Sequence, residues 1–306
     1  MKYLITIVGP TAIGKTALSI ALAQHFNCDI ISCDSRQFFK EMTIGTAVPS
    51  PEELAAAKHH FIQNKSIFDT YTVGEYEKEA LSIIAQLHQT NDYVILVGGS
   101  GLYVDAVLKG FDEFPEIDNA VRETVRMQYD AKGLPFLQEK LKELDQSYFD
   151  SLLENNPQTL QNPQRMMRFV EVGLGTGKAY SSFLNKEKNN RNFTPISIGL
   201  DAERPVIYDR INQRVDIMMN QGLLAEATEL FPNKSLNALQ TVGYRELFSY
   251  FEGEITLKFA VEEIKKNTRR FSKRQLTWFK GNEAIKWFDY LTNPKEIIDY
   301  IKGKSV

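Results

Sequence analysis

The residues best suited to chemistry lie near the amino terminus, in the stretch Gly9-Pro10-Thr11-Ala12-Ile13-Gly14-Lys15-Thr16. This is a complete G-x-x-x-x-G-K-T motif between the apolar run Tyr3–Val8 and a stretch of helical apolar spacing, Thr16–Phe26. Its glycines let successive backbone N–H groups converge on phosphate oxygens, and the N-terminus of the following helix favours an anion. Lys15 adds a mobile positive charge, and the Thr16 hydroxyl is suited to ligate Mg²⁺. The motif predicts phosphate binding without specifying the phosphate compound.

The aspartate with which typical NTPases anchor Mg²⁺ is missing after the apolar run Tyr93–Val97, which ends in Gly98-Gly99-Ser100-Gly101. Asp201 follows a further apolar run, Pro195–Leu200, and leaves this role open. The pattern therefore disfavours a nucleotide-hydrolysing motor or switch.

A polar segment, Asp34-Ser35-Arg36-Gln37, follows the predicted strand Asp29–Ser32. The carboxyl end of a strand beside a phosphate loop is where open α/β sheets bind their ligands. Asp34 could accept a proton from an amine there. Considered alone, it is more simply a polar residue that finishes a strand.

Strands that alternate with helices over the first hundred residues are expected to position these groups. The apolar runs at 3–8, 29–32 and 93–97 predict buried strands. Ser50-Pro51-Glu52-Glu53 predicts a helix start, and a capping box at Thr72-Val73-Gly74-Glu75 opens a helix that reaches about Gln89. The predicted fold class is α/β, a P-loop NTPase-like parallel sheet flanked by helices.

From about residue 116 the pattern changes to polar amphipathic helices, and no strand pattern returns until Pro195. We expect a P-loop α/β core formed by residues 1–115 and 191–306 and an all-helical insertion domain at 116–190. The Asn- and Lys-rich stretch 185–192 predicts a solvated linker. In the second half of the core we expect helices at 204–220, 223–231, 244–251 and 256–280 and a last strand at 284–288.

Composition places the chain among ordinary globular proteins: 306 residues, 43% hydrophobic, 25% charged and a formal net charge of −3. No apolar run approaches the ~20 residues that cross a bilayer, and Gly9-Pro10 interrupts the amino-terminal run that a signal peptide would need. Cys28 and Cys33 lie on a predicted strand that holds them too far apart to bridge. We expect a cytoplasmic protein without membrane association, and a monomer by default.

Positive charge is concentrated near the carboxyl terminus, in a run of seven cationic residues without an acidic one. The rest of the chain therefore carries a net charge of −10. Such a run indicates a polyanion partner or a solvated helix face. The cations are Lys265, Lys266, Arg269, Arg270, Lys273, Arg274 and Lys280. We expect the aromatic residues of this helix, Phe271, Trp278 and Phe279, to pack it onto the core.

Adjacent histidines, His59-His60, could indicate a metal or catalytic site. We expect a packing or capping role at a helix end instead.

Several motifs occur in an order that carries a family resemblance. They are Gly9–Thr16, Asp34-Ser35-Arg36-Gln37, Ile44-Gly45-Thr46-Ala47, Gly98-Gly99-Ser100-Gly101-Leu102-Tyr103, Asn162-Pro163-Gln164-Arg165, Val242-Gly243-Tyr244-Arg245 and Lys273-Arg274-Gln275-Leu276-Thr277-Trp278. With them, the sequence closely resembles bacterial tRNA dimethylallyltransferases, also called tRNA isopentenyltransferases, to about Asp289. The resemblance implies Mg²⁺-dependent transfer of a dimethylallyl group from dimethylallyl diphosphate to N6 of adenosine 37, 3′-adjacent to the anticodon.

The resemblance also assigns roles. Asp34 matches the catalytic aspartate that takes the proton of the amine, and Ser100 keeps the hydroxyl of a threonine usual in the family. The loop Gly9–Thr16 would hold the departing diphosphate, with Lys15 stabilising its charge and Thr16 ligating Mg²⁺. Arg210 or Arg214, spaced i, i+4 on one helix face, would reach the diphosphate. Ile13 is bulkier than the serine expected there.

The anticodon stem-loop of tRNA is the implied partner, with its target base splayed out of the stack and the insertion domain as a clamp. The resemblance and the basic run together predict these RNA-contacting residues: Asp34, Ser35, Arg36, Gln37, Ser100, Arg122, Gln161, Asn162, Pro163, Gln164, Arg165, Gln240, Thr241, Val242, Gly243, Tyr244, Arg245, Arg269, Arg270, Lys273 and Arg274.

Two other functions share part of these features. A P-loop small-molecule kinase would use the same phosphate loop but leave the Asp34 segment and the basic run unexplained. A non-enzymatic RNA-binding switch would change its RNA affinity with nucleotide and form no product. A prenyltransferase directed at adenylate is a close variant of the tRNA enzyme, which the basic run disfavours.

Overall fold

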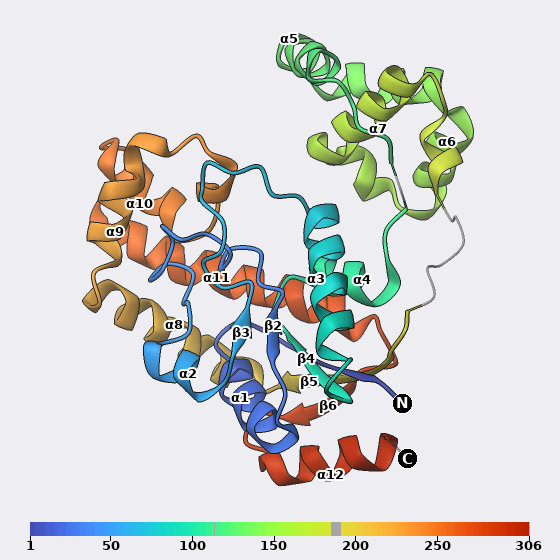
Figure 1. Ribbon diagram of the computed structural model, residues 1–306. Helices are drawn as coiled ribbons and strands as arrows, with labels where there is room; N and C mark the ends of the chain where they lie inside the picture. Colours follow the sequence, from blue (N-terminus) through green and yellow to red (C-terminus); the bar gives the residue numbers. More distant parts are fainter. Residues whose placement is uncertain (113, 185–190, 306) are drawn as a thin grey trace. The chain divides into compact units, whose positions relative to one another are not determined.

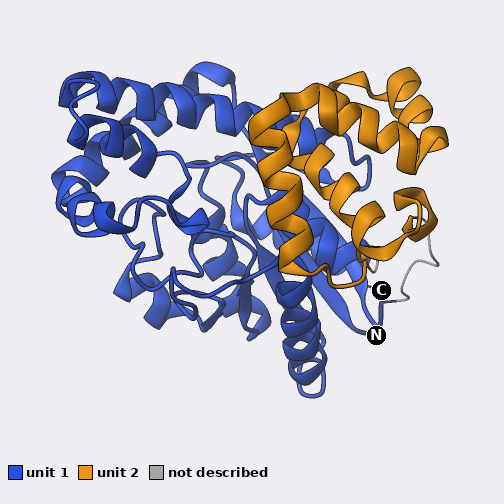
Figure 2. Ribbon diagram, turned by 90° about the horizontal axis from the view of Figure 1, so that it is seen from above, with its two compact units in different colours: residues 1–109, 190–306 blue, residues 110–189 orange. Residues whose placement is uncertain are grey.

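The computed structural model describes residues 1–112, 114–184 and 191–305 (Figure 1). The chain divides into two compact units, residues 1–109 with 190–306 and residues 110–189, coloured blue and orange in Figure 2. The helical unit begins before residue 116 because the ring of Phe114 stacks on that of Tyr180, with 4.8 Å between the ring centroids. Residues 185–190 of the expected linker lie outside the described residues.

The first unit is built on a six-stranded parallel sheet with the order β3-β2-β4-β1-β5-β6. This arrangement confirms the predicted parallel α/β fold. The strands are β1 (Tyr3–Val8), β2 (Ile30–Ser32), β3 (His59–His60), β4 (Tyr93–Val97), β5 (Thr194–Asp201) and β6 (Lys286–Asp289).

Helices cover both faces of this sheet, as the continuous apolar runs of its central strands predict. Ile5 and Ile7 of β1 face a buried cluster that includes side chains of α1 (Lys15–Phe26), α8 (Arg204–Asn220) and α12 (Pro294–Lys304). Leu4 and Val8 face the opposite cluster, with α3 (Val73–Leu87) and α4 (Gly101–Lys109). The loops that follow β1, β2 and β4 at the carboxyl edge of the sheet carry Gly9, Asp34 and Ser100.

Local capping signals place several helices where the sequence predicts them. Ser50 caps α2 (Pro51–Ala56) and Thr72 caps α3, each within a reciprocal capping box. The remaining helices of this unit are α9 (Leu223–Leu230), α10 (Tyr244–Phe251) and α11 (Leu257–Lys280). Helix α12, which follows the strand expected to be the last, has no counterpart in the sequence-based expectations.

The two adjacent histidines lie in a strand, so their expected position at a helix end is wrong. They form the edge strand β3, paired with Ile30 and Ile31 of β2. His60 Nε2 lies 2.8 Å from Asp29 Oδ2, and His59 Nδ1 lies 2.8 Å from the carbonyl oxygen of Ala57. Among the described residues, no group of three or more His, Cys, Asp and Glu side chains is arranged to hold a metal ion.

The second unit is helical, with α5 (Asn119–Leu144), α6 (Gln146–Asn155) and α7 (Pro163–Thr176) around a buried apolar cluster. Gly133, with φ of 71°, breaks α5 into two helical stretches. Asn162 caps α7 by accepting the backbone N–H groups of Gln164 and Arg165. Within the described part of the chain, no helix is both long and apolar enough to cross a membrane.

Candidate active site

The phosphate loop has the backbone that its glycines allow. Gly9, Ala12 and Gly14 have φ of 141°, 64° and 107°, and Gly14 is the N-cap of α1. A Cβ atom on Gly9 would lie 2.4 Å from the carbonyl oxygen of Leu200, so no larger residue fits there. Ile13 is buried in the core, with 1% of its surface exposed, so its bulk leaves the concave side of the loop free.

Lys15 lies folded back over this loop. Its Nζ donates hydrogen bonds to the carbonyl oxygens of Gly9 (3.1 Å) and Pro10 (2.8 Å). Burial lowers the pKa of Lys15 to about 8, while the negative charge of Asp34 acts to raise it and the positive charge of Arg214 acts to lower it. Both hydrogen-bond partners are uncharged, which leaves the charge of Lys15 available to an anion.

This pKa predicts the pH dependence of anion binding. We expect the affinity for inorganic pyrophosphate to fall as the pH rises through about 8, because neutral Lys15 no longer attracts the anion. The bound anion raises the pKa of the lysine, so the loss approaches about tenfold per pH unit above that point. Calorimetric titration of pyrophosphate from about pH 7 to about pH 10 measures this loss of affinity.

The matched control for this experiment is Lys15→Arg, because a guanidinium stays charged over the whole range. Ionisation of pyrophosphate itself is common to both proteins and cancels in the ratio of their affinities. Identical pH profiles for the two proteins would show that Lys15 does not titrate in this window.

Two arginines of α8 meet the phosphate loop from one helix face, as their spacing predicts. Arg210 Nε donates a hydrogen bond to the carbonyl oxygen of Ala12 (2.7 Å), and Arg214 Nη1 donates one to Thr11 Oγ1 (3.2 Å). Burial lowers the pKa of Arg214, against the opposing effect of Asp34. Arg214 is thus the arginine whose charge is felt by both Lys15 and Asp34.

The Asp34 segment and the glycine-rich end of β4 lie side by side. The Ser100 hydroxyl accepts the backbone N–H of Ser35 (3.2 Å), and the two hydroxyl oxygens are 3.1 Å apart. A Cβ atom on Gly98 would lie 2.5 Å from Cys33 Sγ, so only glycine lets the two strand ends approach this closely. Asp34 Oδ1 accepts the backbone N–H of Arg36 (3.1 Å), which holds the carboxylate in place. Two segments distant in sequence therefore form one polar site beside the phosphate loop.

Two residues predicted to contact RNA have side chains engaged inside the protein. Arg36 Nη1 donates to the carbonyl oxygens of Asn237 and Ala238, both at 2.9 Å, and Gln37 Nε2 donates to that of Ala47 at 2.8 Å. Burial lowers the pKa of Arg36. The hydrogen bonds of these two side chains therefore stabilise the loop that follows β2.

Tyr244 is a correction to the predicted RNA surface, because its side chain is fully buried. Its hydroxyl donates a hydrogen bond to Glu226 Oε1 (2.7 Å). The carboxylate of Glu226 also accepts the backbone N–H groups of Thr43, Ile44 and Gly45. Tyr244 therefore secures the loop that contains Ile44-Gly45-Thr46-Ala47, whereas its neighbours Gln240 and Arg245 are exposed.

The basic run on α11 is partly neutralised within the fold. Lys265 pairs with Asp216 and Lys280 with Asp201, both at 2.7 Å, and Lys266 pairs with Glu263 at 2.5 Å. Arg269 donates a hydrogen bond to Asn212 Oδ1 (2.6 Å). The exposed cations of the run outside these pairs are Arg270, Lys273 and Arg274.

The aromatic residues of α11 do not all pack as expected. Phe279 is buried, whereas Phe271 and Trp278 are 38% and 45% exposed, so these two rings pack onto the fold only in part. Phe271 lies under the guanidinium of Arg274, with 5.7 Å between the guanidinium carbon and the ring centroid. The ring of Trp278 covers Gly101, where a Cβ atom would come within 2.4 Å of it.

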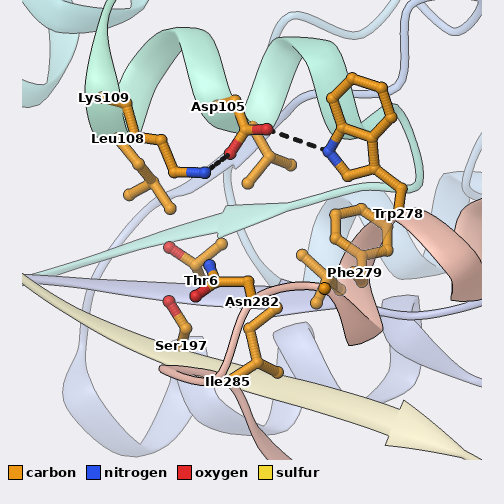
Figure 3. Close-up of a pocket in the computed structure, with 12 residues that line it drawn as sticks. Thr6, Asp105, Leu108, Lys109, Ser197, Trp278, Phe279, Asn282 and Ile285 are labelled. Atoms are coloured by element: carbon orange, nitrogen blue, oxygen red, sulfur yellow. Dashed lines mark hydrogen bonds and ion pairs between the residues drawn. The ribbon is translucent and has the colours of Figure 1, made fainter. Parts of the chain in front are cut away.

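A cavity of about 290 Å³ lies between the sheet and the ends of α4 and α11. Figure 3 shows Thr6 and Ser197 on its sheet side and Asp105 between Lys109 and Trp278. Asp105 accepts the indole N–H of Trp278 (3.0 Å) and pairs with Lys109 (2.8 Å). Because Trp278 covers Gly101, this network supports the segment that carries Ser100.

The helical unit exposes Arg122, Gln161, Gln164 and Arg165. Arg165 Nη1 also donates a hydrogen bond to Thr159 Oγ1 (3.2 Å), which ties it to the preceding turn.

Comparison with known proteins gives concordant matches. The family model described as IPP transferase matches residues 37–282. The chain is 75% identical over 301 residues to the tRNA dimethylallyltransferase of Flavobacterium johnsoniae, with 98% of this chain and 97% of that protein covered. It is 44% identical over 302 residues to tRNA dimethylallyltransferase 1 of Bacteroides fragilis, with 99% and 98% covered.

Solved structures agree with these sequence matches. A full-length tRNA isopentenylpyrophosphate transferase from Bacillus halodurans superposes with a TM-score of 0.73 at 34% identity, over 99% of this chain and 97% of that one. A eukaryotic dimethylallyltransferase acting on tRNA superposes with a TM-score of 0.70 at 26% identity, over 95% and 74%.

Proposed function

The chain belongs to the IPP transferase family, and from this premise we propose that it is a tRNA dimethylallyltransferase. It transfers the dimethylallyl group of dimethylallyl diphosphate to N6 of adenosine 37 in tRNA and releases diphosphate. One observation carries the chemistry: a phosphate loop and the paired Asp34 and Ser100 segments share one edge of the sheet. The phosphate loop suits a diphosphate leaving group, and the Asp34 and Ser100 segments suit a nucleobase amine.

The reaction requires that negative charge be stabilised as it develops on the leaving group. The N6 lone pair attacks the allylic carbon, and the electrons of the breaking carbon–oxygen bond pass to the diphosphate. Loop N–H groups, Lys15 and Arg214 surround the place where a diphosphate would bind, so their stabilising effect grows as that bond breaks. Arg210 fixes the loop backbone through the carbonyl oxygen of Ala12.

Proton removal is assigned to Asp34, whose carboxylate takes the N6 proton as the new carbon–nitrogen bond forms. The Ser100 hydroxyl is assigned a hydrogen bond to the same base, and its 3.1 Å contact with the Ser35 hydroxyl supports this role. A serine lacks the methyl group that restricts a threonine, so its contact with Ser35 takes over that orienting role.

Magnesium fits the donor set of this site. Thr16 follows the loop lysine in the first turn of α1, and its side-chain hydroxyl is a hard oxygen donor of the kind that Mg²⁺ prefers. Mg²⁺ binds through few protein ligands together with phosphate oxygens and water, so a hydroxyl beside a bound diphosphate suits it. Bound there with the diphosphate, it would supply charge neutralisation for the leaving group.

Recognition of the anticodon stem-loop is assigned to the exposed part of the predicted residues. In the first unit these are Gln240, Arg245, Arg270, Lys273 and Arg274, and in the helical unit Arg122, Gln161, Asn162, Gln164 and Arg165. Guanidinium and ammonium groups on helices suit the phosphates of an RNA loop. We propose that the helical unit clamps the stem and that the enzyme works as a monomer.

One assay tests the proposal. The protein is incubated with unmodified tRNA, dimethylallyl diphosphate and Mg²⁺, and the digested nucleosides are analysed by mass spectrometry. A dimethylallyl mass gain on adenosine is expected. ADP or a phosphorylated small molecule from an ATP-containing reaction, with the tRNA unchanged, would instead identify a kinase.

Charge reversal on α11 should weaken RNA binding without altering the chemistry. We expect Lys273→Glu to reduce tRNA affinity and to flatten its salt dependence. The slope of log K against log salt should change by about 0.7 for each phosphate that the variant no longer neutralises. At saturating tRNA the turnover should remain that of the wild type. Filter binding at several salt concentrations measures the effect.

The matched control is Lys258→Glu, which reverses an exposed lysine near the start of the same helix. It changes the net charge equally but lies away from Arg270 and Arg274. If both variants flatten the salt slope alike, the effect reflects net charge, and the assigned RNA surface is wrong.

A further inference from the structure

We propose that Gln275 of α11 is a positioning residue, which holds the phosphate loop and the Ser100 segment at the separation that the transfer requires. The inference rests on the proposed function. It concerns a residue whose side chain lies within the protein, away from the exposed cations of the same helix.

Gln275 bridges two loops that are far apart in sequence. Its Oε1 accepts the backbone N–H of Thr11, and its Nε2 donates to the carbonyl oxygen of Gly99, both at 2.9 Å. The residue is 6% exposed. One planar amide therefore connects the loop that would hold the leaving group with the residue that precedes Ser100.

The chemistry of the amide explains why glutamine suits this position. An apolar side chain would leave the N–H of Thr11 and the buried carbonyl of Gly99 without a hydrogen-bond partner. A glutamate would retain the bond from Thr11, but it would oppose the carbonyl oxygen of Gly99 and place negative charge beside the diphosphate. A Cβ atom on Gly99 would lie 2.2 Å from Gln275 Nε2, so the bridge also requires glycine there.

Lys15 meets the same junction. Its Nζ would lie 3.8 Å from a Cβ atom on Gly99, so the amide, the lysine and the Ser100 segment converge at one point. Arg270, Lys273 and Arg274 are exposed on α11, whereas Ser272, Gln275 and Phe279 are buried. The helix that offers cations to RNA thus also fixes the distance between the two reacting partners.

The bridge can be removed by Gln275→Met, which keeps the length of the side chain but forms neither hydrogen bond. We expect kcat to fall by about 10- to 100-fold. When a reacting group is misplaced by about 1 Å, the rate of a reaction that depends on alignment falls by up to about 100-fold. Affinities for tRNA and for pyrophosphate should change by less than about threefold, since the exposed cations and the phosphate loop are intact. Gln275→Glu should lower kcat as well.

The ratio of prenyl transfer to hydrolysis of the prenyl donor distinguishes a positioning role of Gln275 from a merely structural one. When the nucleobase is misaligned, water attacks the allylic carbon, so diphosphate and dimethylallyl alcohol form without modified RNA. We expect the fraction of diphosphate released without prenylated tRNA to rise in Gln275→Met. In the control Ser272→Ala, which removes a buried hydroxyl from the same helix, this fraction should equal that of the wild type.

Hydrogen exchange provides a second measurement that does not depend on the reaction. In Gln275→Met the amides of residues 9–16 and 98–101 should exchange faster by about tenfold, and in Ser272→Ala they should not. Unchanged exchange, or a proportional loss of transfer and hydrolysis alike, overturns the inference. If wild-type protein formed no prenylated tRNA, the proposed function would fail while the exchange result still decided whether Gln275 fixes both loops.

Discussion

Asp34→Asn is expected to lower kcat by about 10²–10⁴ while leaving the affinity for tRNA within about threefold of the wild type. The amide is nearly isosteric and keeps an oxygen that can accept the backbone N–H of Arg36, which lies 3.1 Å from Asp34 Oδ1. It cannot take the proton of the nucleobase amine. Single-turnover prenylation of unmodified tRNA, together with equilibrium binding, separates the two effects.

Asp29→Asn is the matched control for this experiment. Asp29 lies directly before β2 and pairs with His60 at 2.8 Å and with Lys58 at 3.2 Å, away from the carboxyl end of the strand. Its replacement should change kcat by less than about twofold, since Asp29 precedes β2 whereas Asp34 follows it, and the partners of Asp29 lie outside the candidate site. Wild-type turnover in Asp34→Asn would exclude Asp34 as the base.

Arg214→Ala is expected to lower kcat/KM by about 10²–10³, the typical cost of removing one donor aimed at developing charge. The guanidinium of Arg214 lies half-buried beside the phosphate loop, where its charge lowers the pKa of Lys15 and the charge of Asp34 acts to raise the pKa of Arg214 itself. Pyrophosphate affinity should fall as well, because the same charge acts on the bound product.

Arg210→Ala should have a smaller effect, below about tenfold. Its guanidinium carbon lies 5.2 Å from the centroid of the Tyr290 ring, and its Nε bonds a loop carbonyl, so its role is to support the loop. Steady-state kinetics of the two variants, measured side by side, rank the arginines. A larger loss in Arg210→Ala would assign the diphosphate contact to that residue instead.

Features that depend on short stretches of chain were predictable. The phosphate loop, the capping boxes at Ser50 and Thr72, and the buried strands follow from residues that are neighbours in sequence. The resemblance added the proposed joint role of Asp34 and Ser100 at the reacting base, which composition and spacing alone do not suggest.

Contacts between distant segments were not predictable from local patterns. Tyr244 belongs to a family motif, but whether it faces RNA or Glu226 depends on how α9 and α10 pack. The cations of α11 form an unbroken run in sequence, and their ion pairs with Asp216 and Asp201 arise only when α8 and β5 come close. The edge strand β3 has two residues, too few for a periodic signal, and exists because β2 provides its partner.

By itself, the sequence determined that this protein folds around a parallel sheet with a phosphate loop, because backbone freedom at glycines and the spacing of apolar residues are local properties. The tertiary structure alone decided that Gln275 meets both Thr11 and Gly99, that Arg214 is the arginine near Lys15 and Asp34, and which cations of α11 stay exposed. The reason is physical: hydrogen bonds and desolvation depend on distances between groups, and only the packed chain sets those distances.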